Sequence, residues 1–241
     1  MCFTVEIRLT RDAIENRFQT DSSVLEDFDF RYYYNAFDNP LLPVITQDEP
    51  SRVQLFRWGL IPHWVKDRSQ AQQVRKGTYN ARGESITRKP SFRDSFKRSR
   101  CMVLGHGFFE WQHRTGGKFP WYIKLINDRP FAFAGICENW KDPETGDAIP
   151  TFSIVTTRAN PLLSEIHNSK KRMPVILPEI AEKSWITNDT PTEKLHNLLA
   201  PLPQELLTAH PVSTRLNNRQ ADPHDPSLIK PTYQAGNGVL F

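Results

Sequence analysis

A cysteine stands at position 2, directly behind the start methionine, and only Cys101 and Cys137 follow it in 241 residues. Methionine aminopeptidases remove Met1 when the second residue is small, so we expect the mature chain to begin with Cys2. Its α-amine and thiol, with pKa values of about 8 and 8.5, would both be partly nucleophilic at neutral pH. An aldehyde could form a Schiff base with the amine, and the thiol could then close a five-membered thiazolidine.

Two other interpretations of Cys2 stay open at this point. An N-terminal cysteine can attack an amide with its own amine as the base, which would make the protein a peptidase or amidase. Cys2 could also be only the second residue, with no chemical role. The position of a single cysteine does not decide between these alternatives.

Four further stretches carry residue types that could assist such chemistry, and they are YNARGES, GFFEWQ, EIHNSKKRMPVIL and HPVS. Glu110 lies between Phe109 and Trp111, where loss of hydration would raise the pKa of a carboxyl toward that of a usable acid or base. His167 titrates near neutrality, and Asn80 can hold Cys2 or a sugar by hydrogen bonds. The other candidate residues in these stretches are Arg82, Glu84, Arg172 and His210.

Each of these residues also has a structural interpretation. Glu110 could be a strand-edge carboxylate paired with an arginine, and His167 could cap the C-terminus of a helix. Asn80 and Arg82 could form a turn and its salt bridge. His210 is more typical of a structural residue that supports a site than of a catalyst. We predict the same supporting role for Glu84.

The motifs occur together and in a fixed order from Cys2 to Ser213, with Tyr34-Asn35, WGLIPHW, NAR-E, FEW, IH, RMPVIL and HPVS between these limits. In this combination the chain resembles the SOS-response-associated peptidase (SRAP) family, the abasic-site processing proteins. The resemblance covers most of the sequence. It raises the interpretation of Cys2 as a nucleophile above the alternatives, which none of the motifs does alone.

The resemblance implies a specific activity. Such proteins bind single-stranded DNA at an abasic site and join Cys2 to the ring-opened sugar aldehyde as a thiazolidine, a covalent crosslink that protects the lesion. They are also thought to remove their own Met1. Cys2, Asn80, Glu110 and His167 would be the catalytic residues, no metal or cofactor would be needed, and replication or repair machinery would be the protein partner.

DNA contacts are predicted for a second set of residues. Arginine guanidinium groups suit bidentate phosphate binding, and a flat indole suits stacking beside the lesion, although core packing is an equal alternative for the tryptophan. The predicted DNA-binding residues are Arg82, Arg172, Trp64, Asn35, Lys170 and Lys171.

The chain departs from the family pattern near both ends of the site. Family members usually begin Cys-Gly-Arg, whereas Phe3 and Thr4 follow Cys2 here, so an arginine that could contact phosphate is missing. Tyr33 replaces a second arginine. Three extra residues, 169–171, precede Arg172. These departures concern DNA affinity more than the crosslinking chemistry.

Composition is compatible with this interpretation without requiring it. The net charge is +4 with a pI of about 9.0, which permits a polyanionic partner. Three cysteines without a CxxC pair favour neither a disulfide framework nor a zinc site. The sequence shows neither a leader peptide nor a membrane-length apolar run, so a cytoplasmic protein, associated with the nucleoid when bound to DNA, is expected.

The predicted fold is α+β, with one domain over residues 1–241 and an irregular tail over about 215–241. Runs of aromatic and β-branched residues predict a strongly curved, mostly antiparallel and open barrel-like sheet flanked by short helices. Strands are expected at 51–58, 101–111, 119–126, 130–140, 151–157 and 173–178. Helices are expected at 10–18, 160–167 and 190–200, and loops at 22–50 and 62–79.

Overall fold

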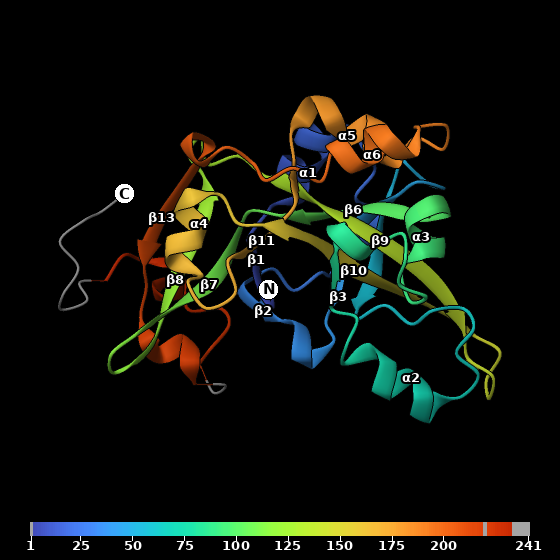
Figure 1. The fold of residues 1–241 in the computed structure, drawn as a ribbon, viewed down its shortest axis with the longest axis horizontal. Helices are drawn as coiled ribbons and strands as arrows, with labels where there is room; N and C mark the ends of the chain where they lie inside the picture. The colour runs from blue at the N-terminus through green and yellow to red at the C-terminus, as the bar shows by residue number, and fades with distance from the viewer. Residues whose placement is uncertain (1, 219–220, 233–241) are drawn as a thin grey trace.

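Two β-sheets and a set of short helices build the molecule (Figure 1). The computed structural model describes residues 2–218 and 221–232. The first sheet is antiparallel, with the order β13-β8-β7-β1-β2. Its strands are β1 (Thr4–Ile7), β2 (Arg31–Asn35), β7 (Gly107–Arg114), β8 (Gly117–Leu125) and β13 (Leu207–Pro211).

The second sheet closes on itself. Its order is β11-β10-β4-β3-β6-β9-β12, and β10 also pairs with β9, so the strands from β10 round to β9 form a small barrel. Two parallel pairings, β10 with β4 and β10 with β5, make this barrel mixed. Its strands are β3 (Leu41–Thr46), β4 (Val53–Trp58), β5 (Asn80–Arg82), β6 (Arg100–Gly105), β9 (Phe131–Lys141), β10 (Ala148–Arg158), β11 (Arg172–Pro174) and β12 (Ile176–Leu177).

Short helices lie around the two sheets. The helices are α1 (Arg11–Phe18), α2 (Arg68–Arg75), α3 (Arg93–Arg98), α4 (Pro161–Ile166), α5 (Glu179–Ile186) and α6 (Thr192–Asn197). The 3₁₀ turns are η1 (Ser23–Leu25), η2 (Ala36–Asp38), η3 (Gly83–Ser85), η4 (Gln204–Leu206), η5 (Thr214–Asn217) and η6 (Pro226–Ile229). The prediction of an α+β fold with a curved, barrel-like sheet is confirmed.

One chain segment connects the barrel to the open sheet. β6 belongs to the barrel and β7 to the open sheet, and only His106 separates them. Its imidazole contacts Glu6 at 3.1 Å through Nδ1 and the carbonyl of Asp128 at 3.1 Å through Nε2. The predicted single run over 101–111 is therefore two strands, because the chain passes from one sheet to the other at this residue.

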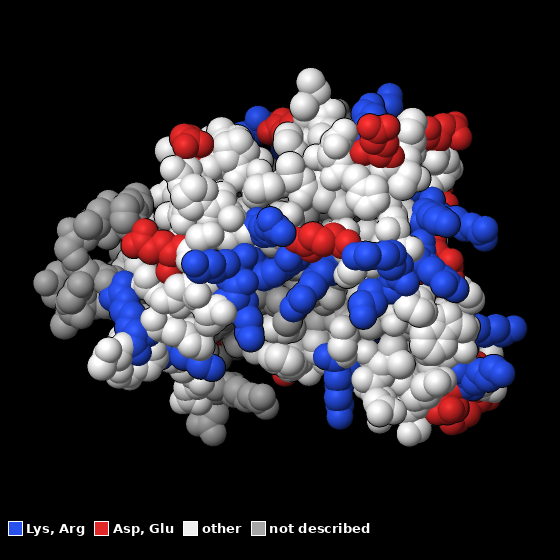
Figure 2. Space-filling model, in the orientation of Figure 1, with Lys and Arg blue, Asp and Glu red and all other residues white. Residues whose placement is uncertain are grey.

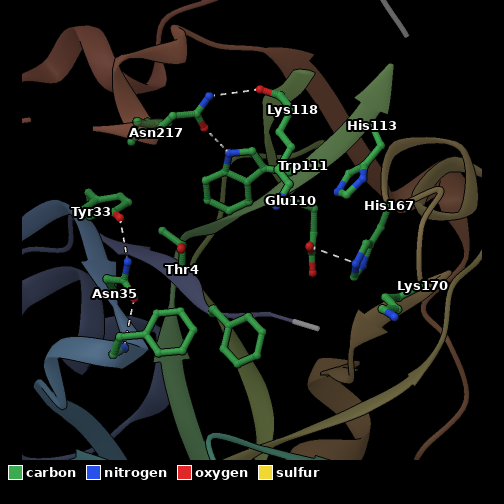
Figure 3. Close-up of a pocket in the computed structure, with 13 residues that line it drawn as sticks. Thr4, Tyr33, Asn35, Glu110, Trp111, His113, Lys118, His167, Lys170 and Asn217 are labelled. Carbon is green, nitrogen blue, oxygen red and sulfur yellow. Dashed lines mark hydrogen bonds and ion pairs between the residues drawn. The ribbon is translucent and has the colours of Figure 1, made fainter. Parts of the chain in front are cut away.

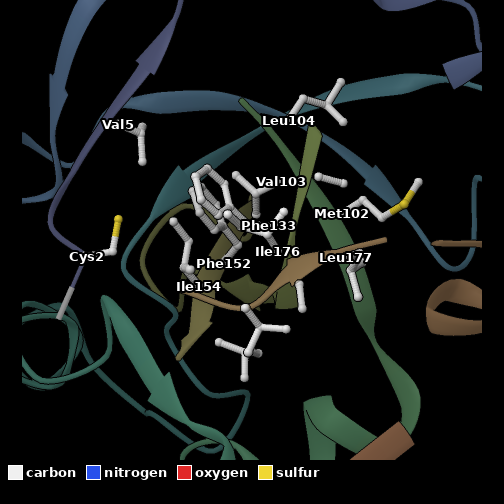
Figure 4. Packing of buried hydrophobic residues seen from close by; sticks show 14 of the residues in the cluster. Cys2, Val5, Met102, Val103, Leu104, Phe133, Phe152, Ile154, Ile176 and Leu177 are labelled. Atoms are coloured by element: carbon white, nitrogen blue, oxygen red, sulfur yellow. The ribbon is translucent and has the colours of Figure 1, made fainter. Parts of the chain in front are cut away.

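The barrel interior forms the main hydrophobic core, and Figure 4 shows Phe133, Phe152, Ile154 and Val103 packed inside it. Val5 joins the same cluster from β1. Close-packed apolar side chains of this kind supply most of the stabilising free energy of a domain. This core holds β1 firmly and so fixes the start of the chain.

Two helix predictions are confirmed. Thr10 caps α1 and accepts a hydrogen bond from the backbone of Ala13, and Asn160 caps α4 with Pro161 at its first position. The prediction of a Thr190 cap is wrong. Pro191 is extended at the N-cap, α6 begins at Thr192, and the Thr190 hydroxyl instead donates to the carbonyl of Ser184 at 2.7 Å.

Both predicted loops contain regular structure. The segment 22–50 holds β2 and β3, because its aromatic and aliphatic residues find strand partners that are distant in sequence. The segment 62–79 holds α2, which Asp67 caps by accepting from Gln70 at 2.7 Å. Ala71 and Val74 are the apolar residues of this helix that join a core cluster, so the segment has few hydrophobic positions and resembles a polar loop in sequence.

The segment after β13 has no α-helix or strand in the residues described there, as expected. It is nevertheless packed, because Leu216 and Leu228 are buried against Phe109 and Tyr122 of the open sheet. The last part of the predicted tail, 233–241, lies outside the described residues. In the described part of the chain, no helix is both long enough and apolar enough to cross a membrane.

Candidate active site

A cavity of about 730 Å³ lies where the open sheet meets the C-terminus of α4 (Figure 3). Residues from the N-terminal strand, β2, β7, β8 and η5 contribute to it, although they are far apart in sequence. The lining residues are Phe3, Thr4, Tyr33, Asn35, Phe37, Glu110, Trp111, His113, Lys118, His167, Lys170, Leu216 and Asn217. It brings together four predicted site residues, namely Glu110, His167, Asn35 and Lys170.

Glu110 occupies the middle of the open sheet. β7 lies between β1 and β8, so the interpretation of Glu110 as a strand-edge carboxylate paired with an arginine is wrong. The side chain is buried, and its Oε2 lies 3.3 Å from Nδ1 of His167. Burial raises the pKa of Glu110 to about 7. A carboxyl with this pKa can donate and accept protons at physiological pH.

His167 caps a helix, as one interpretation of the sequence suggested, and it also lies at the cavity, where the predicted catalytic role would require it. Its backbone N–H closes the C-terminus of α4 by donating to Leu163, and its ring lines the cavity. Burial lowers the pKa of His167 to about 4, so the imidazole is neutral at pH 7. Nδ1 lies 2.9 Å from the carbonyl of Arg172, which can only accept, so the proton resides on Nδ1 and Nε2 is the acceptor nitrogen.

Glu110 and His167 are therefore in polar contact without forming an ion pair, because the carboxyl is charged only above about pH 7 and the imidazole only below about pH 4. Their environments separate the two proton affinities, with the carboxyl titrating near pH 7 and the imidazole near pH 4. Such a separation is typical of residues that act as acid and base in one reaction. The pair can thus supply a proton from Glu110 while His167 stays neutral.

Cys2 lies beside this pair but points into the core. It is fully buried, its Sγ lies 3.8 Å from the carbonyl oxygen of Thr4, and Figure 4 shows the sulfur on the side of Val5. Burial, and secondarily the negative charge of Glu110, raises the pKa of the Cys2 thiol far above its ordinary value. The thiol is therefore held protonated in this arrangement.

Asn80 fixes the position of Cys2. Its Nδ2 donates to the Cys2 carbonyl at 2.8 Å, and the parallel pairing of β5 with β10 aligns Asn80 with Ile154. Asn80 is part of a strand, so the alternative of a turn with a salt bridge is wrong. Its Oδ1 is buried and has no hydrogen-bond partner among residues 2–218 and 221–232. This oxygen can accept a hydrogen bond from an amine or a sugar hydroxyl.

The two predicted phosphate-binding arginines differ in exposure. Arg172 is buried, and its guanidinium makes two hydrogen bonds to Glu84, at 2.7 and 3.0 Å, and one to the carbonyl of Thr156 at 2.7 Å. Glu84 thus holds Arg172 in place, as expected of a supporting residue. Arg82 is exposed and has no ion-pair partner within the described ranges. The Arg82 side chain is therefore accessible to a ligand, whereas the Arg172 guanidinium already bonds to groups within the protein.

The other predicted DNA-binding residues surround the cavity or lie farther away. Lys170 lines it, and Lys171 is exposed in a left-handed turn with a φ of 49°. Asn35 donates to the Tyr33 hydroxyl at 2.9 Å and accepts from the backbone of Phe37 at 3.0 Å. Trp64 is 39% exposed and donates to the carbonyl of Pro90 at 3.4 Å, so it is a surface residue outside the cavity lining.

His210 is placed away from the cavity. It lies in β13, its ring packs against Tyr122 with centroids 5.5 Å apart, and its Nε2 lies 2.8 Å from the carbonyl of Ile229. These contacts join β13 to the turn η6. They agree with the structural role that the sequence favoured for it.

Sequence reasoning missed most of the aromatic and amide lining of the cavity. Trp111 directly follows Glu110, and its Nε1 donates to Asn217 Oδ1 at 2.6 Å. Asn217 in turn donates to the carbonyl of Lys118 at 3.0 Å. Trp111 could have been found from its place beside Glu110 in the FEW motif, but nothing local in the sequence placed Asn217 against it.

Figure 2 shows Lys and Arg side chains gathered in a band across the middle of one face, between the α4 side and the α3 side of Figure 1. Lys118 and Lys170 add positive charge at the cavity itself. Within the described ranges, no group of three or more His, Cys, Asp or Glu could hold a metal ion. The site combines a carboxyl, an imidazole and a cysteine beneath a basic surface.

Comparison with known proteins agrees with this geometry. The profile of the family "SOS response associated peptidase (SRAP)" matches residues 1–219. The chain belongs to the SRAP family. It is 34% identical over 232 residues to the "Abasic site processing protein YoqW" of Bacillus subtilis, an alignment that covers 95% of this chain and 99% of that relative.

A chicken relative and a solved structure extend the SRAP comparison. The Gallus gallus "Abasic site processing protein HMCES" is 34% identical over 197 residues, covering 73% of this chain and 57% of that protein. A crystal structure of a Bacteroides thetaiotaomicron protein superposes with a TM-score of 0.91 at 36% identity, covering 96% of this chain and all of that one. The SRAP family and the fold expected from the sequence are both confirmed.

Proposed function

We propose that this SRAP protein processes abasic sites in single-stranded DNA by forming a covalent crosslink through Cys2 after removal of Met1. One observation carries the proposal: Asn80 holds Cys2 in the protein interior next to the buried pair of Glu110 and His167. The names of relatives such as the Bacillus subtilis and chicken proteins support abasic sites as the substrate.

The reaction follows from the groups at the site. Once Met1 is removed, the Cys2 α-amine adds to the aldehyde of the ring-opened sugar, and loss of one water gives an imine. The Cys2 thiol then adds to the imine carbon and its proton passes to the nitrogen, which closes the thiazolidine. The net change is one carbon–nitrogen bond and one carbon–sulfur bond formed, with one water released.

The state of the thiol sets the order of these steps. Because burial keeps the Cys2 thiol protonated, the amine is the first nucleophile, and the thiol needs only to rotate toward the imine carbon. Glu110 can donate the proton that turns the aldehyde oxygen into water. The neutral His167, with Nε2 as an acceptor, can assist opening of the sugar ring.

Denaturing electrophoresis tests this function. The protein is mixed with single-stranded oligonucleotides that contain or lack one abasic site. A shifted band that survives denaturation, requires the abasic site and disappears in Cys2→Ala is the expected result. A matched variant, Cys137→Ala, removes another buried cysteine and should still crosslink.

Two other outcomes would overturn the proposal. Cleavage of added peptides without any dependence on DNA would favour an N-terminal-nucleophile peptidase acting in trans. Salt-sensitive binding that is indifferent to the abasic site, with Met1 retained, would favour a non-catalytic single-strand binder.

A further inference from the structure

Much of the cavity lining is aromatic. Phe3, Tyr33, Phe37 and Trp111 line it, and Figure 3 shows Tyr33 on the side opposite His167 and Lys170. The crosslinking chemistry uses Cys2, Glu110 and His167 and gives the aromatic side chains no role. Aromatic side chains at a basic site therefore indicate a ligand that has both negative charge and a flat apolar group.

Phe3 and Phe37 form a stack that is supported from behind. Their ring centroids are 5.0 Å apart with planes 26° from parallel. Tyr79 packs edge-on against both rings, at 6.3 Å from Phe3 and 5.5 Å from Phe37, and is itself buried. The tyrosine is fixed in turn, because its carbonyl accepts from Trp58 Nε1 at 2.9 Å. The stack is thus rigid before any ligand arrives.

The Phe37 side chain is 51% exposed, although it packs against Phe3 and Tyr79. Asn35 accepts from the Phe37 backbone N–H at 3.0 Å and so holds it at the start of η2. An exposed aromatic side chain on a fixed backbone, stacked on the half-buried Phe3 ring, offers a π-face at little entropic cost. A flat ring of a ligand could therefore stack on Phe37 and extend the Phe3–Phe37 pair.

The size and charge of the cavity identify the kind of ring. Its volume of about 730 Å³ falls within the range of roughly 300–1,000 Å³ that suits a drug-sized ligand, which leaves room for more than a deoxyribose. Lys118 and Lys170 in the lining suit the phosphates of a nucleic acid strand. Single-strand binders combine such positive charge with aromatic rings on which bases stack.

We propose that Phe37, backed by Phe3 and Tyr79, binds the unpaired base next to the abasic nucleotide, so that capture depends on an intact neighbouring base. This inference rests on the proposed function, because it takes the ligand to be single-stranded DNA with an abasic site. It also gives a role to Phe3, which stands where family members usually carry glycine. Stacking on this platform would supply affinity that the absent arginine at position 4 does not provide.

The test uses binding without chemistry. Single-stranded oligonucleotides carry one tetrahydrofuran residue, an abasic analogue with no aldehyde, and in matched oligonucleotides the 5′ or the 3′ neighbour is also tetrahydrofuran. Fluorescence anisotropy gives Kd for each. We expect removal of the neighbouring base on one side to weaken wild-type binding by about 5- to 150-fold, the range found for a base–aromatic stack.

Phe37→Ala should weaken binding to the oligonucleotide with the intact base by a similar factor and should bind the base-less one as the wild type does. Phe37→Trp should restore the dependence on the base. Ile180→Ala, at a 93% exposed position on α5 outside the cavity, is the control and should change neither Kd. Thermal unfolding checks that the variants are folded.

Two results would overturn the inference: an equal loss of affinity for both oligonucleotides in Phe37→Ala, or wild-type binding that ignores both neighbouring bases. Failure of the proposed function would look different. In that case the wild-type protein would form no denaturation-resistant band with a natural abasic site, whatever the anisotropy measurements give.

Discussion

At the scale of single residues, the environment of Glu110 and His167 decides which of them carries a proton. Both are buried, but burial acts in opposite directions because it disfavours the charged form of each. The pKa of the carboxyl rises to about 7 and that of the imidazole falls to about 4. Near neutral pH, therefore, Glu110 exchanges protons while His167 remains a neutral acceptor.

Glu110→Gln should slow crosslinking by about 10²- to 10⁴-fold, because the amide keeps the shape of the side chain but cannot transfer a proton. The wild-type rate should also fall above pH 7 as Glu110 ionises, and this decline should be absent in the variant. Rates from quenched denaturing gels at several pH values measure both effects.

Glu138→Gln is the matched control, because Glu138 also faces a histidine, with its Oε2 3.3 Å from Nδ1 of His63, but lies outside the cavity lining. It should crosslink at the wild-type rate. Equal rates for Glu110→Gln and the wild type would contradict a proton-transfer role for Glu110.

The same two pKa shifts predict opposite trends in stability. Between about pH 4.5 and 7 the folded protein binds more protons at Glu110 than the unfolded chain does, so this residue makes stability fall as pH rises. Between about pH 4 and 6.5 the unfolded chain binds more protons at His167, so this residue makes stability rise with pH. The two trends oppose each other in the wild type.

Single substitutions should separate these trends. As pH rises from about 5 to 6.5, His167→Gln should lose free energy of unfolding relative to the wild type, and Glu110→Gln should gain it. Urea unfolding across this pH range measures the difference. If both variants simply parallel the wild type, the assigned protonation states are wrong.

At the scale of elements, the junction between β6 and β7 places Glu110. Glu6 on β1 is fully buried and accepts a hydrogen bond from the Tyr122 hydroxyl at 2.7 Å. This contact requires glycine at position 107, since a Cβ there would lie 2.3 Å from the Tyr122 ring. The absence of a side chain at one residue thus lets β1, β7 and β8 pack together.

Gly107→Ala should lower the free energy of unfolding by about 1–3 kcal/mol, the usual effect of overpacking a core. Gly77→Ala is the control, because its new Cβ would meet nothing closer than 3.6 Å and should change stability by less than about 0.5 kcal/mol. Denaturant unfolding compares the two. A neutral Gly107→Ala would show that the Tyr122 ring moves at no cost.

Local sequence signals predicted the elements that depend on their own residues. The caps of α1 and α4 are examples, because Thr10 and Asn160 bond to backbone groups three residues away. The strand β2 was missed, because its pairing with β1 is a tertiary contact that the loop-like composition around it conceals. Thr190 was misassigned for the same reason, since its hydroxyl bonds to Ser184 and not to its own helix.

Several residues of the candidate site could be predicted from the sequence, but their arrangement in space could not. Cys2, Glu110 and His167 were predicted because residue chemistry and the order of family motifs pointed to them. Their proximity comes from β1–β7 pairing and from the position of α4, neither of which a sequence pattern determines. The aromatic stack of Phe3, Phe37 and Tyr79 left no recognisable motif at all.

At the scale of the whole molecule, basic side chains gather in a band across one face (Figure 2). Lys118 on β8 and Lys170 after α4 come from separate elements and supply charge at the cavity. Affinity for single-stranded DNA should therefore fall steeply with salt.

Lys118→Gln and Lys170→Gln should each reduce the slope of log K against log salt by about 0.7, the value for loss of one phosphate contact with a single strand. Lys194→Gln, on α6, should leave the slope unchanged. Anisotropy titrations at several salt concentrations provide the slopes. Unchanged slopes in both cavity variants would place the phosphates elsewhere.

The proposed reaction is the condensation of Cys2, freed of Met1, with the abasic-site aldehyde. Intact mass spectrometry of the protein after incubation with an abasic oligonucleotide tests it most directly. We expect an adduct whose mass is the sum of the chain without Met1 and the oligonucleotide, less one water, with the linkage at Cys2 after digestion. An adduct at another residue, or none from protein that has lost Met1, would contradict it.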